Sequence, residues 1–384
     1  MSPSVPFSRS LFTLLALTFL VAETRAGFQD FGIPPSDSTV DVKAFNVANF
    51  TLNNLTHVFV APVLPGRESI TLPMHAFLVE HTASQKKFMF DLGMRNDPQN
   101  LTPPFAGFFS SGAITVGEFK DMTELLQDGG VSLESVDSVF WSHAHFDHIG
   151  DMSKFPNSTG IVVSTGTDLT IFPTSNSSDL QASDLAGHKV TQVNFDAANL
   201  TISGFKAIDY FNDGSFYLLN TPGHLAGHMT ALARVTPTSF VLLGGDTYHH
   251  VGQIRPLGDF QVNFPCPGDI LEETKSISTD FFWSSGTTDG DFDLLSRTQT
   301  LFSVSDTPDS FYVDPKAATL SVDKVASLDA DPDFFVVISH DFSVLSYLPY
   351  FPASLNYWQK SGLKEKTVWK FLDEANPAFL FNPT

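Results

Sequence analysis

Cysteine is almost absent from this chain. One cysteine, Cys266, occurs in 384 residues, so no disulfide can form within the chain. Cys266 lies between two prolines, and this setting favours a free thiol or a buried loop residue over a metal ligand.

Basic residues are also scarce. The chain has 21 lysines and arginines against 42 aspartates and glutamates, a formal net charge of -21. A surface of this charge repels phosphate backbones, so we expect no nucleic-acid partner. Such acidity is typical of a protein that stays soluble in an extracellular setting. Charged residues of both signs make up only 16% of the chain, whereas phenylalanine occurs 38 times. This composition predicts a large aromatic core and leaves room for an apolar substrate pocket.

The N-terminal apolar run, Leu11 to Ala22, is too short to span a membrane comfortably. Arg9 precedes this run, and Thr24-Arg25-Ala26 offers the small residues that a signal peptidase reads. The pattern predicts a secretory signal peptide at residues 1–26, with no stable membrane insertion after cleavage. An uncleaved anchor is the alternative.

Sequons for N-glycosylation are dense in the remaining chain, which favours passage through the secretory route and a secreted glycoprotein. They begin at Asn49, Asn54, Asn100, Asn157, Asn176 and Asn199.

Neither a fixed-period repeat nor a long low-complexity tract is present. Residues 27–384 are compatible with one large domain. We expect residues 27–60 to form an N-terminal arm, because they contain Pro34-Pro35 and two sequons. Residues 255–300 are rich in Gly, Asp, Ser and Phe, and we interpret them as an insertion or lid near the site.

Strands interspersed with helices favour an α/β fold, an αββα sandwich. Helices are predicted at 118–127, 314–326 and 354–374. Strands are predicted at 75–79, 87–91, 136–141, 161–164, 190–195, 205–210, 216–219, 230–235, 239–243 and 334–339.

The most informative segment follows the apolar strand Val136 to Trp141. It is His143-Ala144-His145-Phe146-Asp147-His148. Alternate residues of an extended chain face one side, so His143 and His145 can point together. Imidazoles and a carboxylate this close form a ligand set suited to zinc or a similar divalent ion. The alternative, a polar turn that happens to hold histidines, is less consistent with the rest of the chain.

Three further strands end in a metal-ligand residue type. His224 follows the turn Thr221-Pro222-Gly223, Asp246 follows Gly244-Gly245, and His340 follows Ser339. A histidine at one strand end is usually structural, but this ordered series after a dense cluster favours a metal site.

These motifs resemble those of the metallo-β-lactamase-fold hydrolases. Phe88-Met89-Phe90-Asp91 resembles a buried strand of that family, one that ends in an acid near the metals. The resemblance runs from about residue 71 to residue 340 and is strongest to the N-acyl-homoserine-lactone lactonase and glyoxalase II branches and to secreted relatives of fungal type.

The resemblance implies two zinc ions or other divalent metals. His143, His145 and His224 would hold one metal, and Asp147, His148 and His340 the other, with Asp246 bridging them. It also implies that a hydroxide shared by the metals attacks the substrate carbonyl. Asp147 or a metal-bound water would protonate the leaving oxygen.

Other residues near these motifs have supporting roles in this interpretation. Tyr248 would donate a hydrogen bond to the substrate, although its spacing from Asp246 departs from the lactonase pattern. Asp91 would orient a ligand imidazole, and His228 would lie behind the ligands or pack nearby. We expect one of His249 and His250 to support the ligands or face solvent.

We therefore expect a secreted hydrolase that opens a lactone, of the acyl-homoserine-lactone type, with a small-molecule substrate. The Phe105 to Phe109 loop could line an acyl-chain pocket or face the core. Lactam or amide hydrolysis and glutathione-thioester hydrolysis remain alternatives, and a non-catalytic metal-binding protein is the third class. The lysines at 360, 364, 366 and 370 could bind glutathione, but their spacing favours a solvated helix face.

Overall fold

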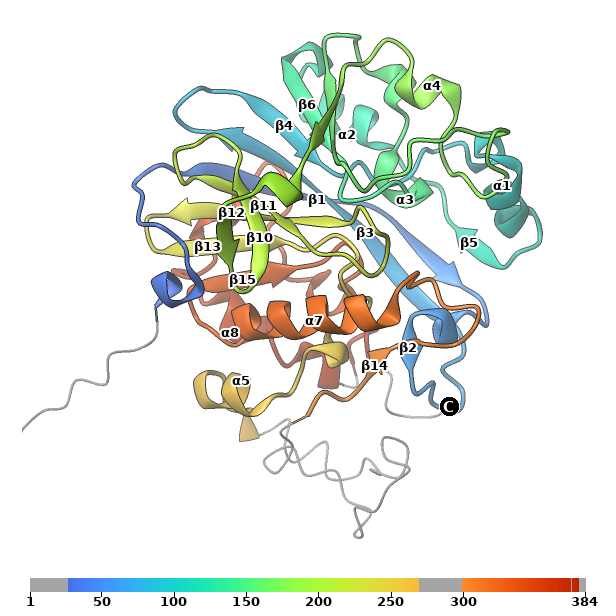
Figure 1. Ribbon diagram of the computed structural model, residues 1–384. Helices are drawn as coiled ribbons and strands as arrows, with labels where there is room; N and C mark the ends of the chain where they lie inside the picture. The colour runs from blue at the N-terminus through green and yellow to red at the C-terminus, as the bar shows by residue number, and fades with distance from the viewer. Residues whose placement is uncertain (1–26, 269–298, 374, 380–384) are drawn as a thin grey trace, which may run out of the picture.

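Two mixed β-sheets pack face to face in the computed structural model, which describes residues 27–268, 299–373 and 375–379 (Figure 1). The first has seven strands, in the order β5 (Ile114–Val116), β1 (Val40–Leu52), β3 (Ile70–His81), β4 (Lys87–Phe90), β6 (Val136–Phe140), β7 (Gly160–Ser164) and β8 (Val190–Val193). The second has six, in the order β15 (Phe334–Val337), β13 (Ser239–Leu243), β12 (Met229–Thr236), β11 (Phe216–Asn220), β10 (Phe205–Asp209) and β9 (Leu200–Ile202). β2 (Val60–Ala61) and β14 (Ser303–Val304) form a small separate ribbon.

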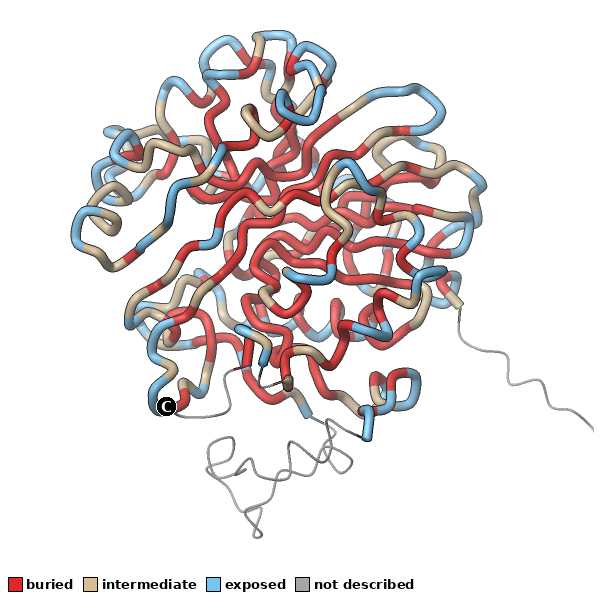
Figure 2. Tube along the Cα trace, turned by 180° about the vertical axis from the view of Figure 1, so that it is seen from behind, coloured by how far each residue is buried: buried red, intermediate tan, exposed pale blue. Residues whose placement is uncertain are grey.

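Helices cover the outer faces of the two sheets. They are α1 (Pro103–Ser110), α2 (Met122–Asp128), α3 (Phe146–Ile149), α4 (Ala182–Leu185), α5 (Gly258–Asn263), α7 (Pro315–Asp329) and α8 (Leu363–Thr367). This arrangement confirms the predicted αββα sandwich. Figure 2 shows that buried residues fill the centre of the molecule and exposed ones lie on its outer loops.

The apolar layer between the sheets comes from strand alternation. Val40, Val42 and Ala44 of β1 face the same core as Phe88 and Phe90 of β4, all almost fully buried. The second sheet contributes Phe216, Leu218, Val241 and Leu243 to that core. Burial of this kind stabilises the fold by about 25 cal/mol per Å² of apolar surface.

Helix α7 shows how local sequence fixes an outer element. The Asp314 side chain accepts hydrogen bonds from the backbone N–H groups of Lys316 and Ala317, and Pro315 occupies the first turn. Ala318, Val322 and Val325 recur at helical spacing and are buried against the second sheet.

Several predicted elements were wrong. Residues 40–52 are not part of an arm but form β1, which pairs with β3 from Val40–His81 to Leu52–Ile70. Asn49, a sequon residue, lies beside a bulge in this strand rather than in a loop. The residues taken for a loop at 105–109 lie within α1.

The single helix predicted over residues 354–374 was also wrong. Short turns and the five-residue helix α8 replace it, since Gly362 adopts a left-handed conformation with φ of 64° just before α8. Lys364 is fully buried rather than solvated, and its ammonium donates to the carbonyls of Asp329, Asp331 and Phe334.

The predicted signal peptide, residues 1–26, lies outside the described residues, as does most of the predicted lid, residues 269–298. Within the described ranges, no helix combines the length and apolar character that crossing a bilayer requires.

Candidate metal centre

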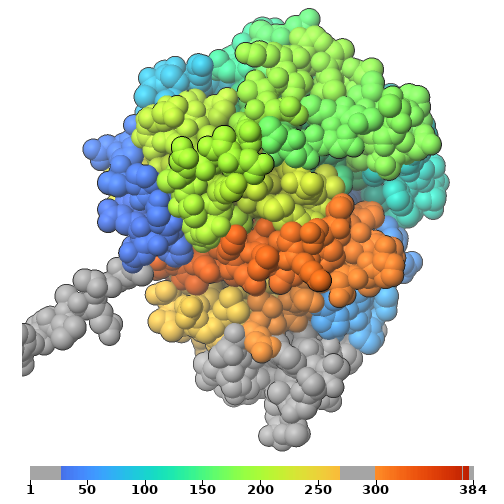
Figure 3. Space-filling model, in the orientation of Figure 1, coloured from blue at the N-terminus to red at the C-terminus, as the bar shows by residue number. Residues whose placement is uncertain are grey.

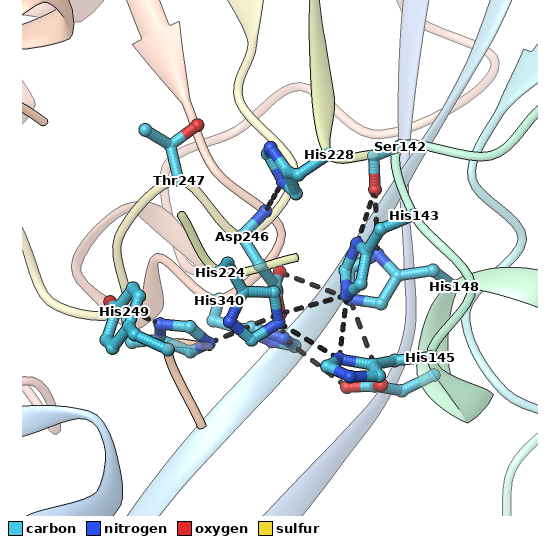
Figure 4. Close-up of polar contacts among 12 residues, drawn as sticks. Ser142, His143, His145, His148, His224, His228, Asp246, Thr247, His249 and His340 are labelled. Carbon is cyan, nitrogen blue, oxygen red and sulfur yellow. Dashed lines mark hydrogen bonds and ion pairs between the residues drawn. The ribbon is translucent and has the colours of Figure 1, made fainter. Parts of the chain in front are cut away.

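Four chain segments bring the seven predicted ligands together, and Figure 4 labels all of them except Asp147. His143 and His145 follow β6, and Asp147 and His148 lie on the short helix α3 that begins after His145. All four are buried except the partly exposed His145.

The other three ligands come from the second sheet. His224 follows β11, Asp246 follows β13 and His340 follows β15, so each lies just past the carboxyl end of a strand. β13 and β15 are parallel neighbours, which places Asp246 and His340 side by side. Gly245 has φ of 51°, and a Cβ there would lie 2.8 Å from His228 and from Ser142, so only glycine fits this turn.

The first ligand set surrounds the Oδ2 atom of Asp246. His145 Nδ1 lies 2.9 Å from His143 Nε2 and 2.9 Å from His224 Nε2. Asp246 Oδ2 lies 3.8 Å from His143 Nε2 and 3.5 Å from His224 Nε2. Four donor atoms therefore face a common point.

The second set surrounds the other oxygen of the same carboxylate. Asp246 Oδ1 lies 3.1 Å from His148 Nε2 and 3.2 Å from His340 Nε2. Asp147 completes the set, 3.8 Å from His148 Nε2 and 3.4 Å from His340 Nε2. Asp246 thus offers one oxygen to each set.

These separations fit metal ions. Ligands about 2.0–2.1 Å from a tetrahedral zinc ion lie roughly 3.3 Å apart, close to the distances between the donor atoms of both sets. Within the described chain, His148 Nε2 and Asp246 Oδ1 are buried and have no hydrogen-bond partner. A buried polar atom without a partner is costly, and a cation between these two would satisfy both.

Burial determines the charge state of the first set. Desolvation lowers the pKa of His143 and His224 well below the ordinary value and lowers that of His145 to about 4. These imidazoles are therefore neutral, which is the form that binds metals.

In the second set the carboxylates outweigh burial. Burial opposes protonation, but Asp246, Asp91 and Asp147 raise the pKa of His148 well above its usual value. Asp246 and Asp147 likewise raise the pKa of His340 to about 10 against the effect of burial. Without a metal this half of the site holds protons, and a metal must displace them.

Hydrogen bonds behind the ligands fix their orientation. Asp91 Oδ2 accepts from His148 Nδ1 at 2.9 Å, as predicted, and also from the Ser142 hydroxyl at 2.8 Å. His340 Nδ1 lies 2.7 Å from the carbonyl oxygen of Pro73. His228 Nε2 accepts from the Asp246 backbone N–H at 2.9 Å, so His228 supports the bridging residue.

Tyr248 does not lie in the substrate-contacting position that was predicted for it. Its side chain is fully buried, does not line the cavity over the ligands, and has a hydroxyl without a partner among the described residues. Burial raises its pKa well above the usual value, and the charged groups that affect it are Asp329, Arg255 and Asp341. Contact with substrate, as predicted for Tyr248, is inconsistent with this position.

The neighbouring His249 contacts the site instead. Its Nε2 lies 3.2 Å from Asp246 Oδ2, its Nδ1 lies 2.8 Å from the Tyr312 hydroxyl, and its ring stacks on Phe59 at 3.9 Å. Only the proximity of His249 to Asp246 in the sequence could have suggested this. His250 points elsewhere and bonds the Ala378 carbonyl.

Asp341 does not orient His340. It is buried, and it accepts from the backbone N–H and the hydroxyl of Ser343.

An apolar cavity of about 200 Å³ opens over both ligand sets. Asp147, His224, Asp246 and His340 form its polar floor. Its walls include Phe50, Phe59, Phe105, Phe146 and Phe311. Phe105 comes from the segment predicted to line an acyl-chain pocket.

Comparisons with known proteins agree with this geometry. Residues 71–247 match the model of the metallo-beta-lactamase superfamily. The chain is 34% identical over 368 residues to Gamma-lactamase FDB1 of Fusarium pseudograminearum, covering 90% of this chain and 84% of that protein. It is also 34% identical over 368 residues to Metallo-hydrolase mfmC of Annulohypoxylon moriforme, covering 90% of each.

Among solved structures, a mutant of B. thuringiensis AiiA with N-decanoyl-L-homoserine bound at its active site shares the fold. It aligns with a TM-score of 0.54 at 17% identity, over 83% of this chain and 99% of that one. With both fungal relatives aligned over most of their length, the chain belongs to the metallo-beta-lactamase superfamily and is a metal-dependent hydrolase.

Proposed function

We propose that this protein is a binuclear-metal hydrolase that opens a lactone with an apolar substituent. The observation that carries the proposal is the pair of four-atom ligand sets sharing Asp246 beneath a phenylalanine-lined cavity. His143, His145 and His224 would hold one zinc or similar ion, and Asp147, His148 and His340 the other. When bound, the two metals supply a nucleophilic hydroxide at neutral pH and polarise the carbonyl.

The side chains would prepare this reaction in distinct ways. The aromatic walls take the apolar part of the substrate and exclude water from the ring carbonyl. Burial opposes ionisation of Asp147, but His148 and His340 lower its pKa, so it enters the reaction as a carboxylate. From the cavity floor it can accept the proton of the nucleophile and pass it to the leaving oxygen.

His249 has a positioning role in this proposal. With the Tyr312 hydroxyl at its Nδ1, its Nε2–H faces Asp246 Oδ2 and fixes the carboxylate that both ligand sets share.

Lactam opening is the second candidate, because a gamma-lactamase is 34% identical over 90% of this chain. The two reactions need the same attack on a carbonyl but differ in the leaving atom. Thioester hydrolysis of an anionic glutathione conjugate is less favoured, since no lysine or arginine lines the cavity over the ligands in the described part of the chain.

We further propose that the protein is secreted and glycosylated. The asparagine of each sequon has an exposed side chain in the folded protein, at positions 49, 54, 100, 157, 176 and 199. Mass spectrometry of the protein from culture medium, before and after glycosidase treatment, tests both statements. Retention of residues 1–26 would contradict the predicted cleavage.

The deciding experiment measures hydrolysis of acyl-homoserine lactones, lactams and a glutathione thioester by purified protein of known metal content. Preferential lactone opening that is lost on chelation and restored by zinc supports the proposal. A preference for lactams would change the proposed leaving atom from oxygen to nitrogen and leave the proposed metal site unchanged. No turnover with two metals bound would support a non-catalytic metal-binding protein.

A further inference from the structure

A second cavity lies beside the first set of ligands. It has a volume of about 270 Å³ and is lined by His143, His145 and the loops 166–168, 175–180 and 225–227. His145 and Val313 line this cavity and the apolar one as well, so the two adjoin at the candidate metal centre. Figure 3 shows the face where the green and yellow segments that include these loops border the orange segment that includes residue 313.

The lining of this second cavity is more polar than that of the first, although Leu180, Leu225 and Val313 also contribute to it. Hydroxyl groups come from Thr167, Ser175 and Ser177, and carboxylates from Asp168 and Asp179. No lysine or arginine lines it among the described residues. A site rich in hydroxyls and acids binds hydrogen-bonding groups and repels anions.

Two of these side chains show how a ligand would be held. The hydroxyls of Ser175 and Ser177 lie 3.2 Å apart, an interaction that a substrate hydroxyl can replace. Asp179 is only 6% exposed, yet it lines the cavity, and its Oδ2 accepts from the Phe146 N–H at 2.6 Å. Burial raises the pKa of Asp179 well above its usual value, so this carboxyl group can accept from or donate to a polar group of the substrate from a fixed position.

We propose that this second cavity is a substrate subsite for an uncharged or cationic hydrogen-bonding group, such as a hydroxyl or an ammonium group. The substrate is then amphiphilic, with its scissile ring over the ligands, its apolar part against the phenylalanines and its polar substituent beyond His145. This inference rests on the proposed function, because it assumes that the ring opens at the candidate metal centre. It also predicts discrimination against anionic substituents.

The test uses N-hexanoyl-homoserine lactones whose ring bears hydrogen, hydroxymethyl, aminomethyl or carboxylate beside the ring oxygen, or the matching lactams. Hydroxymethyl and aminomethyl should lower KM about threefold to tenfold relative to hydrogen, the range of a net hydrogen bond. The carboxylate should raise KM by about tenfold or more through repulsion. Asp168→Asn should reduce the carboxylate penalty and the aminomethyl gain but keep the hydroxymethyl gain.

Asp196→Asn is the matched control, because it makes the same charge change at an exposed acid that does not line the cavity. Equal KM values for the four compounds, or equal effects of the two variants, would overturn the subsite. If no ring opens, the proposed function fails. Calorimetric dissociation constants of the same compounds on zinc-loaded protein then decide the subsite by the same ranking.

Discussion

Among the described residues, the cluster at the candidate metal centre and the cluster around Arg255 both bury charged side chains, but they differ in how completely their atoms are paired. At the candidate metal centre, His148 Nε2 and Asp246 Oδ1 face each other without a hydrogen bond among the described residues. In the other cluster, Arg255 donates to both oxygens of Asp329 at 2.7 and 2.8 Å and to the Val368 carbonyl, while Lys364 donates to three carbonyls.

The difference separates two uses of buried charge. A cluster whose donors and acceptors are all paired can join α5, α7 and α8 into one structure and needs nothing from outside. The imidazoles and carboxylates of the metal centre lie at ligand spacing. The atoms behind them are paired and the inward-facing atoms are not, so this cluster is suited to bind cations. Removing a residue should therefore cost activity in the first cluster and stability in the second.

The largest effect is expected from Asp246→Ala. This change removes an oxygen from each ligand set, so both metals should be lost together. Activity should fall by more than the roughly 10–100-fold that an outer partner of a metal ligand is worth. Metal analysis and kinetics measure this, with Asp196→Ala as a control at an exposed acid. Full occupancy by two metals in Asp246→Ala would disprove the bridging role.

Arg255→Ala should instead destabilise the fold. It leaves the Asp329 carboxylate buried without its partner, which costs about 3–5 kcal/mol in comparable pairs. Chemical denaturation measures the loss, and the folded fraction should keep its metals. Combining Arg255→Met with Asp329→Leu removes both charges and should recover most of the stability. Loss of metal at unchanged stability would contradict the contrast between the clusters.

His249→Phe is expected to have an intermediate effect. The ring should still stack on Phe59, but the hydrogen bond to Asp246 Oδ2 is lost. Metal affinity or activity should fall about 10–100-fold. Cobalt-substituted protein adds a readout beyond activity, because its absorption spectrum should change when the bridging carboxylate is less fixed. Tyr312→Phe should produce a smaller change of the same kind.

A result that leaves the spectrum, the metal affinity and the rate of His249→Phe unchanged would remove His249 from the site. His188→Gln serves as a control for altering a buried histidine, since the two ring nitrogens of His188 lie 2.9 Å and 3.0 Å from the carbonyl oxygens of Thr159 and Met152.

The pH dependence of metal-induced stabilisation sharpens the comparison further. In the metal-free protein the pKa of His340 is raised to about 10, so its protonation stabilises the fold. This stabilisation is fully present below about pH 6.5 and is lost as the pH rises through 10. A metal displaces this proton, so the increase in Tm on metal loading should grow from pH 6.5 to 9.5. Calorimetry at fixed free zinc measures the difference.

Lys364 should not affect the increase in Tm on metal loading. Burial lowers its pKa to about 8, so its contribution to stability rises with pH between about 8 and 10.5 in metal-free and metal-loaded protein alike. A metal-induced increase in Tm that is constant or shrinks with pH would contradict proton displacement at the ligands.

The sequence predicted the ligand segments but not their surroundings. His143 to His148 are recognisable because consecutive ligand types follow an apolar strand, and His224, Asp246 and His340 because each ends one. Contacts from distant segments were not predictable in this way. Tyr312 reaches His249 across 63 positions, and Lys364 reaches the end of α7, only because the fold brings them together. β1 was missed because the sequons at Asn49 and Asn54 and the prolines before the strand suggested irregular structure.

Tyr248→Phe should have the smallest effect. A lactonase-like role predicts slower turnover for this variant, but the hydroxyl is buried near Arg255 and Asp329 and has no partner among the described residues. Removing an unpaired buried hydroxyl should leave kcat and KM unchanged and alter stability by at most about 1 kcal/mol. Tyr248 and His249 are adjacent in the sequence. Comparing Tyr248→Phe with His249→Phe therefore tests whether His249 belongs to the metal centre and Tyr248 to the cluster around Arg255. A Tyr248→Phe enzyme that turns over more slowly with both metals bound would show that Tyr248 takes part in the reaction and belongs with the metal centre.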